Sequence, residues 1–269
     1  MSGPAGNEGA VEVAAPAKLT LTLRVTGVRP DGYHELESEM VSLDLADSLR
    51  LGPGDGLTVV AADGGEVPGV PAGPDNLVTR ALAAVDRRAA VRLVKRIPPG
   101  AGLGGGSADA AAVLRWAGCG DLEVAASLGA DVPFCLTGGR ARVSGIGESV
   151  APLGYVPRSF VLLLLPFGME TASVYRAWDH LGERGLLPEP GTVVNELEAP
   201  ATSVEPRLVP WKDALARSTG TRPQLAGSGS TWFVEGTPDE LGLGERRFLT
   251  LGTERARLVP VRTVPAVGV

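Results

Sequence analysis

The chain carries the segment Pro98-Pro99-Gly100-Ala101-Gly102-Leu103-Gly104-Gly105-Gly106-Ser107, and the run Ala108-Asp109-Ala110-Ala111-Ala112-Val113-Leu114 follows it directly. Five glycines between Gly100 and Gly106 allow backbone N–H groups to approach a ligand that side chains would keep away. The alanine-rich run favours a helix, for which Ser107 is the expected N-cap and Asp109 a first-turn residue. A helix N-terminus offers unpaired N–H donors and the positive end of the helix dipole. The segment therefore predicts a phosphate-binding loop.

The glycine spacing leaves more than one kind of phosphate site open. Gly100, Gly102 and Gly105 match the dinucleotide-binding pattern G-x-G-x-x-G, and Asp121 follows at about the distance expected of its acidic residue. Against this, Pro98-Pro99 and the additional glycines lengthen the turn. The P-loop pattern G-x-x-x-x-G-K-[ST] and the H-R-D and D-F-G motifs of protein kinases do not occur. A dinucleotide-binding oxidoreductase therefore remains an alternative to a phosphotransferase.

Length and composition indicate a globular chain of one large or two modest domains. The chain has 269 residues, of which 44% are hydrophobic and 21% charged, and its net charge is −6. This acidic balance predicts no nucleic-acid partner and no binding to an anionic membrane surface. Residues 1–10 lack a basic segment followed by an apolar run, and the apolar run Val161 to Leu165 is too short to span a bilayer. We therefore expect a cytoplasmic protein.

The segments on either side of the glycine-rich loop show regular patterns. Leu19, Leu21 and Leu23 alternate with polar residues, which predicts a half-buried strand with Lys18 and Thr20 on its polar face. A turn is predicted at 29–32, directly before Tyr33 and His34. Further predicted elements are a helix capped by Asn76, a strand over 91–97, a helix over 121–128, strands over 140–144 and 160–165, helices over 171–181 and 211–217, and a strand-loop-strand over 224–235.

Two features are interpreted as structural. Cys119 and Cys135 have neither metal-ligand spacing nor a disulfide-rich context, so both are expected to be small buried residues. Val174, Tyr175, Trp178 and Leu181 recur at helical spacing, which indicates a core-facing stripe rather than a cofactor site.

Phosphoryl transfer needs a cation to neutralise charge and a carboxylate to take the proton of the acceptor hydroxyl. Lys18 is one of only three lysines among 25 basic residues, the others being Lys95 and Lys212, and it is the candidate cation. Asp131, in the connection before Val132-Pro133, is the candidate carboxylate. From the residues alone, Lys18 can equally be a solvated charge at a strand end, and Asp131 a turn residue.

Four segments together resemble the GHMP kinase superfamily. They are Ala15-Pro16-Ala17-Lys18, Arg29-Pro30-Asp31-Gly32-Tyr33-His34-Glu35-Leu36, Ile97 through Ser107, and Gly129-Ala130-Asp131-Val132-Pro133-Phe134. The resemblance continues to Ser230 and covers nearly the whole chain in order. The segment Asp31-Gly32-Tyr33-His34 is specific to one branch of the superfamily, which acts on 4-diphosphocytidyl-2-C-methyl-D-erythritol in the non-mevalonate isoprenoid pathway.

This resemblance implies a fold and a reaction. The fold is α+β with two domains, a ribosomal protein S5 domain 2-like N-terminal domain over 1–153 and a ferredoxin-like C-terminal domain over 154–269, with the active site between them. The reaction transfers the γ-phosphoryl group of ATP, with Mg²⁺, to the 2-hydroxyl of a small-molecule substrate. The oligomeric state stays open between a monomer and a weak homodimer.

The resemblance also implies roles for single residues. Asp131 is the catalytic base, and Lys18 keeps its carboxylate ionised and stabilises the transferring charge. Tyr33 and His34 recognise the cytosine, and Thr20 contacts the substrate. Ser107 lies near the magnesium ion. The residues implied to bind ATP are Asn76, Lys95, Pro98, Pro99, Gly100, Ala101, Gly102, Leu103, Gly104, Gly105, Gly106, Ser107 and Ala108.

The chain departs from the family pattern in three places. Thr20 stands where the family carries Asn, the stretch 116–122 is shorter than usual, and Glu170 stands where the family more often has a small polar residue. These departures keep two alternatives in view besides the oxidoreductase: a GHMP kinase that phosphorylates a different alcohol, and a homologue that binds nucleotide without catalysis.

Overall fold

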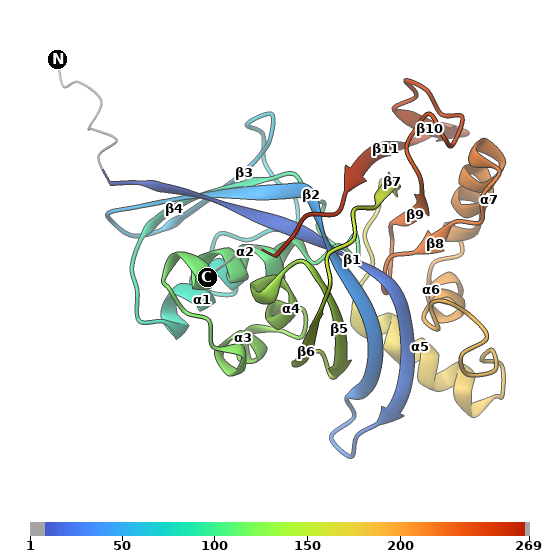
Figure 1. Cartoon of the computed structure of the whole chain (residues 1–269), viewed down its shortest axis with the longest axis horizontal. Helices are drawn as coiled ribbons and strands as arrows, with labels where there is room; N and C mark the ends of the chain where they lie inside the picture. The colour runs from blue at the N-terminus through green and yellow to red at the C-terminus, as the bar shows by residue number, and fades with distance from the viewer. Residues whose placement is uncertain (1–8, 267–269) are drawn as a thin grey trace.

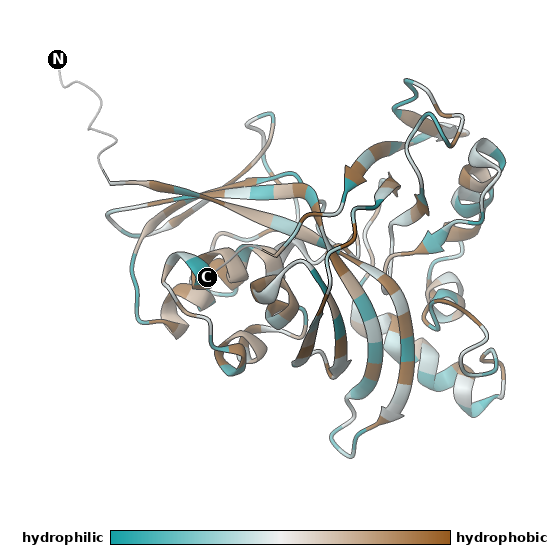
Figure 2. Cartoon of the chain, viewed as in Figure 1, coloured by the Kyte–Doolittle hydropathy of each residue, from teal (hydrophilic) through white to brown (hydrophobic). Residues whose placement is uncertain are grey.

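A long antiparallel hairpin runs through the molecule (Figure 1). The computed structural model describes residues 9–266, in which β1 (Val11–Val28) pairs along its length with β2 (His34–Gly52). In the connecting turn the N–H of Arg29 donates to the carbonyl oxygen of Tyr33 at 2.8 Å. Figure 2 shows apolar and polar residues alternating along both strands. The predicted strand and the predicted turn are both confirmed.

The first sheet is built on β2. Its other strands are β3 (Leu57–Ala61), β4 (Ala90–Lys95), β5 (Arg140–Gly145) and β6 (Ser149–Leu153). The sheet has the order β3-β4-β2-β5-β6, and β1 also pairs with β2. β4 and β5 pair with opposite ends of β2, both antiparallel, and β3 runs parallel to β4. The strand that enters the glycine-rich loop, β4, is therefore held from both sides.

Four helices pack against this sheet and enclose the first hydrophobic core. They are α1 (Leu77–Ala84), α2 (Gly105–Trp116), α3 (Leu122–Leu128) and α4 (Val132–Thr137). Asn76 caps α1 as predicted, because its Oδ1 accepts a hydrogen bond from the N–H of Val78 at 2.9 Å. The helix α4 was not predicted, although Pro133 suits the first turn of a helix.

The predicted N-cap of α2 is wrong. The helix begins at Gly105, and its N-cap is Gly104 rather than Ser107. Gly104 has a φ of 66°, in the left-handed region that glycine reaches without steric strain. The chain therefore turns into the helix before it reaches Ser107, which lies within the first turn.

The second sheet is antiparallel throughout. Its strands are β7 (Ser159–Leu164), β8 (Gln224–Leu225), β9 (Trp232–Glu235), β10 (Phe248–Leu251) and β11 (Glu254–Arg262), in the order β10-β11-β7-β9-β8. It shares a second core with α5 (Thr171–Glu183), α6 (Glu198–Val204) and α7 (Leu208–Thr219). The predicted elements over 160–235 are confirmed, whereas β6, α6, β10 and β11 were not predicted.

The two sheets are joined by a third core. Leu19 of β1 and Leu43 of β2 pack there with Phe160 and Phe233 of the second sheet. The end of the chain also returns to the first sheet, where the N–H of Val264 donates to the carbonyl oxygen of Ser42 at 2.9 Å (Figure 1). The α+β class is confirmed, while the domain boundary after residue 153 stays a prediction.

Within residues 9–266, no helix is long and apolar enough to cross a membrane. Cys119 and Cys135 are both free thiols there, and burial raises the pKa of the Cys135 thiol. Cys135 is buried in the first core as predicted, whereas Cys119 is only partly buried and packs against that core.

Candidate active site

A cavity of about 830 Å³ opens between the two sheets, a size that suits a small-molecule site. It is lined by β1, the turn at Gly32, the glycine-rich loop, the start of α5 and the loop at Gly227 and Ser228. The sequence-predicted site residues that line it are Lys18, Thr20, Tyr33, His34, Asn76, Lys95, Asp131 and all of 98–107. Ala108 is the exception, because its side chain is buried in the first core. Tertiary packing thus brings nearly the whole predicted set to one cavity.

Lys18 and Asp131 form an ion pair in this cavity. Lys18 Nζ lies 3.4 Å from Asp131 Oδ2, and the lysine side chain is 7% exposed against 33% for the aspartate. Lys18 is therefore no solvated strand-end charge. Its ammonium also donates to Thr20 Oγ1 at 3.2 Å, and its backbone N–H donates to the carbonyl oxygen of Leu103 at 3.0 Å. The ammonium is thus held by Asp131 and Thr20, and the backbone of Lys18 is held against the glycine-rich loop.

Asp131 occupies the N-cap position of α4, yet its side chain makes no capping hydrogen bond. The start of the helix therefore does not use the carboxylate that forms the ion pair with Lys18. The backbone of Asp131 does lie in a turn, as one of the two interpretations predicted, but that interpretation did not include the ion pair with Lys18.

The glycine-rich loop is held by backbone hydrogen bonds from the second half of the chain. The carbonyl oxygen of Gly100 accepts from the N–H of Met169 at 2.9 Å and from that of Ser230 at 3.3 Å. A Cβ on Gly102 would lie 2.3 Å from the carbonyl oxygen of Ala226, and one on Gly104 would lie 2.7 Å from Lys18 Cγ. These two glycines are required by contacts within the protein as well as by access for a ligand.

The first turn of α2 faces the cavity. Gly105, Gly106 and Ser107 all line it, and the N-cap Gly104 has no side chain to occupy their N–H groups. The first N–H groups of a helix have no partner within it, so they can bind an anionic group. The early start of α2 therefore improves the predicted phosphate site.

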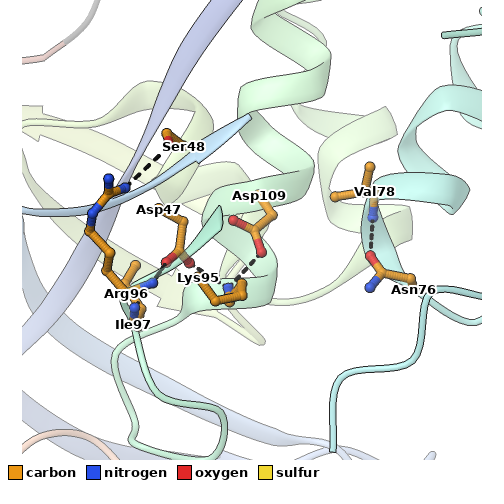
Figure 3. A network of polar contacts seen from close by, with 8 residues as sticks. All are labelled: Asp47, Ser48, Asn76, Val78, Lys95, Arg96, Ile97 and Asp109. Carbon is orange, nitrogen blue, oxygen red and sulfur yellow. Dashed lines mark hydrogen bonds and ion pairs between the residues drawn. The ribbon is translucent and has the colours of Figure 1, made fainter. Parts of the chain in front are cut away.

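Lys95 lies between two carboxylates at the foot of this loop (Figure 3). Its ammonium donates to Asp47 Oδ2 and, at 2.7 Å, to Asp109 Oδ2. All three residues are buried. Desolvation alone would lower the pKa of Lys95, but the charges of Asp109 and Asp47 outweigh it, and the pKa is raised. Lys95 is thus a fixed cation with both partners supplied by the protein.

The surroundings of Asp109 raise the pKa of its carboxyl group. Burial, opposed by Lys95 and reinforced by Asp47, raises the pKa of Asp109 to about 7. Its Oδ1 is buried and has no hydrogen-bond partner among the described residues. Such an atom is costly to bury, which favours the protonated form.

Asn76 lines the cavity wall, but its polar atoms are used locally. Its Oδ1 caps α1 by accepting from the N–H of Val78 (Figure 3), and its Nδ2 donates to the carbonyl oxygen of Pro71 at 2.7 Å. These bonds fix the segment before α1 rather than leave the amide free.

Tyr33 and His34 line the cavity where the chain turns from β1 into β2. Tyr33 is 60% exposed, whereas His34 is held by a hydrogen bond of 2.7 Å between its Nε2 and Asp179 Oδ1. The centroid of the His34 ring lies 4.7 Å from that of the Tyr175 ring and 5.3 Å from that of the Trp178 ring. Burial raises the pKa of Tyr175 to about 12, so it remains a neutral phenol.

The interpretation of the α5 stripe as core needs correction for Tyr175. Val174 is fully buried as predicted, but Tyr175 packs against the second core and also lines the cavity beside His34. Helical spacing places Tyr175 and Asp179 on one face of α5, which is the signal that could have identified both. Asp47 carried no comparable signal, because only the pairing of β2 with β4 brings it to Lys95.

The donor groups fit Mg²⁺ bound mainly through a nucleotide. Within residues 9–266, no three His, Cys, Asp or Glu side chains are grouped so that they could hold a metal ion. Mg²⁺ typically keeps several waters and binds through one or two protein oxygens together with substrate phosphates. The Ser107 side chain, at the cavity wall beside the first-turn N–H groups, suits that arrangement.

Comparison with known proteins identifies the relatives of this chain. Residues 76–139 match the family model of the GHMP kinases N terminal domain. A 4-diphosphocytidyl-2-C-methyl-D-erythritol kinase of Paracoccus denitrificans is 41% identical over 235 residues, covering 82% of this chain and 85% of the relative. The crystal structure of a 4-(cytidine 5'-diphospho)-2C-methyl-D-erythritol kinase superposes with a TM-score of 0.67 at 32% identity, covering 94% of this chain and all of that one.

A more distant neighbour shares the fold alone. The crystal structure of a mevalonate kinase matches with a TM-score of 0.56 at 12% identity. The dinucleotide-binding alternative is wrong, because β5, the next strand after α2 in this sheet, does not pair with β4; the antiparallel β2 lies between them. A dinucleotide fold needs neighbouring parallel strands joined by the helix that follows the glycine-rich loop.

Proposed function

We infer the reaction from the family: the chain belongs to the 4-diphosphocytidyl-2-C-methyl-D-erythritol kinases. It transfers the γ-phosphoryl group of ATP to the 2-hydroxyl of 4-diphosphocytidyl-2-C-methyl-D-erythritol, a step of the non-mevalonate route to isopentenyl diphosphate. The match covers 85% of the Paracoccus relative and all of the solved kinase.

For the chemical step, we propose that Asp131 is the general base and Lys18 its electrostatic partner. The observation that carries this assignment is the ion pair of 3.4 Å beside the glycine-rich loop. Asp131 accepts the proton of the substrate hydroxyl as that oxygen attacks the γ-phosphorus. The Lys18 ammonium holds the carboxylate in place and stabilises the negative charge that develops on the transferring group.

The phosphates of ATP are proposed to bind at the start of α2. The N–H groups of Gly105, Gly106 and Ser107 face the cavity there, and the positive end of the helix dipole adds to their attraction for an anion. Ser107 is the proposed protein ligand of Mg²⁺, and the ion when bound neutralises phosphate charge. Asn76 and Lys95 lie along the wall that the base and sugar of the nucleotide would contact.

The cytosine end of the substrate is proposed to bind at Tyr33, His34 and Tyr175. The two tyrosines supply aromatic faces, and His34 supplies a ring nitrogen whose orientation Asp179 fixes. An aromatic stack with an edge hydrogen bond is a common way to recognise a base. Thr20 is placed between the two ends of the cavity, where its hydroxyl already accepts from Lys18.

A coupled ADP-release assay tests this function. The reaction contains ATP, Mg²⁺ and 4-diphosphocytidyl-2-C-methyl-D-erythritol, with homoserine, mevalonate and galactose as parallel acceptors. We expect turnover on the cytidylyl substrate alone. Turnover only on another acceptor would keep the kinase and discard the substrate, and binding of ATP without any turnover would point to a non-catalytic homologue.

A further inference from the structure

The network of Asp47, Lys95 and Asp109 connects the two ends of the glycine-rich loop. Asp47 comes from β2, Lys95 is the last residue of β4 before the loop, and Asp109 lies on α2 after it (Figure 3). The loop itself spans 98–104. No base-contacting role is needed to explain why these three charges are buried together.

Asp47 holds the entry to the loop. Its Oδ1 accepts from the backbone N–H groups of Arg96 and Ile97, the latter at 2.9 Å, and its Oδ2 accepts from the Lys95 ammonium. Three donors on consecutive residues thus converge on one carboxylate that is fully buried. The direction in which the chain leaves β4 is therefore set by Asp47.

Lys95 connects this entry to the exit of the loop. Its ammonium donates to Asp109 Oδ2 at 2.7 Å, and a Cβ on Gly105 would lie 3.1 Å from Lys95 Nζ. The ammonium therefore lies directly beneath the first residue of α2. Its position fixes where that helix begins relative to β4.

The middle of the loop is held by other contacts. Its carbonyl oxygens accept from the N–H groups of Lys18, Met169, Ser230 and Thr231. Those bonds use carbonyl oxygens of the loop, so they do not involve the N–H groups in the first turn of α2. Among the polar side-chain contacts of residues 9–266, those of Asp47, Lys95 and Asp109 connect the two ends of the loop to each other.

We propose that Asp47, Lys95 and Asp109 are positioning residues that hold the glycine-rich loop and the first turn of α2 in the geometry that binds the triphosphate of ATP. This inference rests on the proposed function and refines it, because it assigns Lys95 to the phosphate end through the loop rather than to the base and sugar. The network acts before substrate arrives, so its loss weakens binding of the triphosphate and leaves binding of the nucleoside alone unchanged.

The substitution Asp109→Ala removes the hydrogen bond between Lys95 and α2 at the exit of the loop and keeps the contacts of Asp47 at its entry. It leaves the Lys95 ammonium paired with Asp47, so no unpaired charge is created, and alanine suits a helix rich in alanine. Asp109→Asn is the conservative variant, since its amide oxygen can still accept from Lys95. The matched control is Glu198→Ala, which removes the carboxylate of another lysine pair, with Lys212, outside the cavity.

The measurement is calorimetric titration of each full-length variant with a non-hydrolysable ATP analogue and Mg²⁺, and separately with adenosine. We expect Asp109→Ala to raise the Kd of the ATP analogue by about tenfold and to leave the Kd of adenosine unchanged. Asp109→Asn should recover most of the loss, and Glu198→Ala should behave as wild type. In kinetics, KM for ATP should rise in Asp109→Ala while KM for the cytidylyl substrate stays constant.

The outcomes separate this inference from the proposed function. An equal loss for adenosine and the ATP analogue would place the network at the base and sugar and overturn the proposal. Unchanged binding of both ligands in Asp109→Ala would also overturn it. Absence of ATP-analogue binding by the wild-type protein would refute the proposed function itself. Thermal unfolding shows which variants are folded at the assay temperature. If Asp109→Ala is unfolded, Asp47→Asn is titrated in its place, and we again expect a higher Kd for the ATP analogue and an unchanged Kd for adenosine.

Discussion

Gly102 lies so close to Ala226 that a Cβ on the glycine would be 2.3 Å from the alanine carbonyl oxygen. The contact joins the glycine-rich loop to the loop between β8 and β9, so residues from both sheets fix the shape of the phosphate site. Because the obstructing atoms are backbone, they cannot rotate away as a flexible side chain would.

Gly102→Ala is therefore expected to destabilise the protein and abolish kinase activity. The substitution places a methyl group against backbone and forces an L residue to a φ of 75°, which together should cost more than about 2 kcal/mol. Urea unfolding measures the change in free energy. Gly118→Ala is the matched control, because Gly118 has a φ of 73° with open space around it, and it should cost only about 1 kcal/mol. Equal costs for the two variants would contradict the packing argument.

Asp131→Asn is expected to reduce kcat by about 10²- to 10⁴-fold, the usual contribution of a general base. The amide cannot take the proton of the acceptor hydroxyl, although it preserves the size of the side chain. The Kd for an ATP analogue should change little, because the proton transfer belongs to the transition state. Single-turnover kinetics with saturating substrates provides the test, and a kcat within a few-fold of wild type would remove Asp131 from the role of base.

Tyr33→Ala is expected to raise KM for the cytidylyl substrate with little change in KM for ATP. Loss of one aromatic stack on a base costs about 1–3 kcal/mol, equivalent to roughly tenfold or more in affinity. The folding free energy should be nearly unchanged, because Tyr33 is 60% exposed. Tyr155→Ala is a control, as Tyr155 is another exposed tyrosine outside the cavity. An unaltered KM in Tyr33→Ala would disprove the cytosine assignment.

The stability of the protein should depend on the protonation of Asp109. Burial raises its pKa from 3.8 in the unfolded chain to about 7 in the folded protein, so the folded state binds this proton more tightly. The resulting stabilisation is complete below about pH 4 and is lost as the pH rises through about 7. Chemical denaturation of wild type and Asp109→Asn across this range isolates the effect, because other groups cancel in the difference. The free energy of unfolding of wild type should fall relative to the variant as the pH rises, and a constant difference would contradict it.

The sequence predicted those helices, strands and turns that are set by the residues of the segment itself. The alternation around Leu21 predicted β1, the residues around Asp31 predicted the turn after it but not the returning strand β2, and the amide of Asn76 predicted the start of α1. The start of α2 was missed because two local signals competed there. Ser107 is a good capping residue, but the freedom of Gly104 to adopt a positive φ decided the boundary.

The family resemblance of the glycine-rich loop and the Tyr33-His34 pair identified the kinase before the fold was known, and 41% identity to a curated relative agrees with it. Motifs of this kind are short and contiguous, so the sequence alone determined the fold class and the family, while the phosphate site stays a prediction. The partners of the site residues could not be obtained in this way. Asp47 meets Lys95 only because β2 pairs with β4, and His34 meets Asp179 only because α5 packs beside the hairpin. Burial and ion pairing depend on which distant segments exclude water from a charge, and the tertiary structure alone decided that.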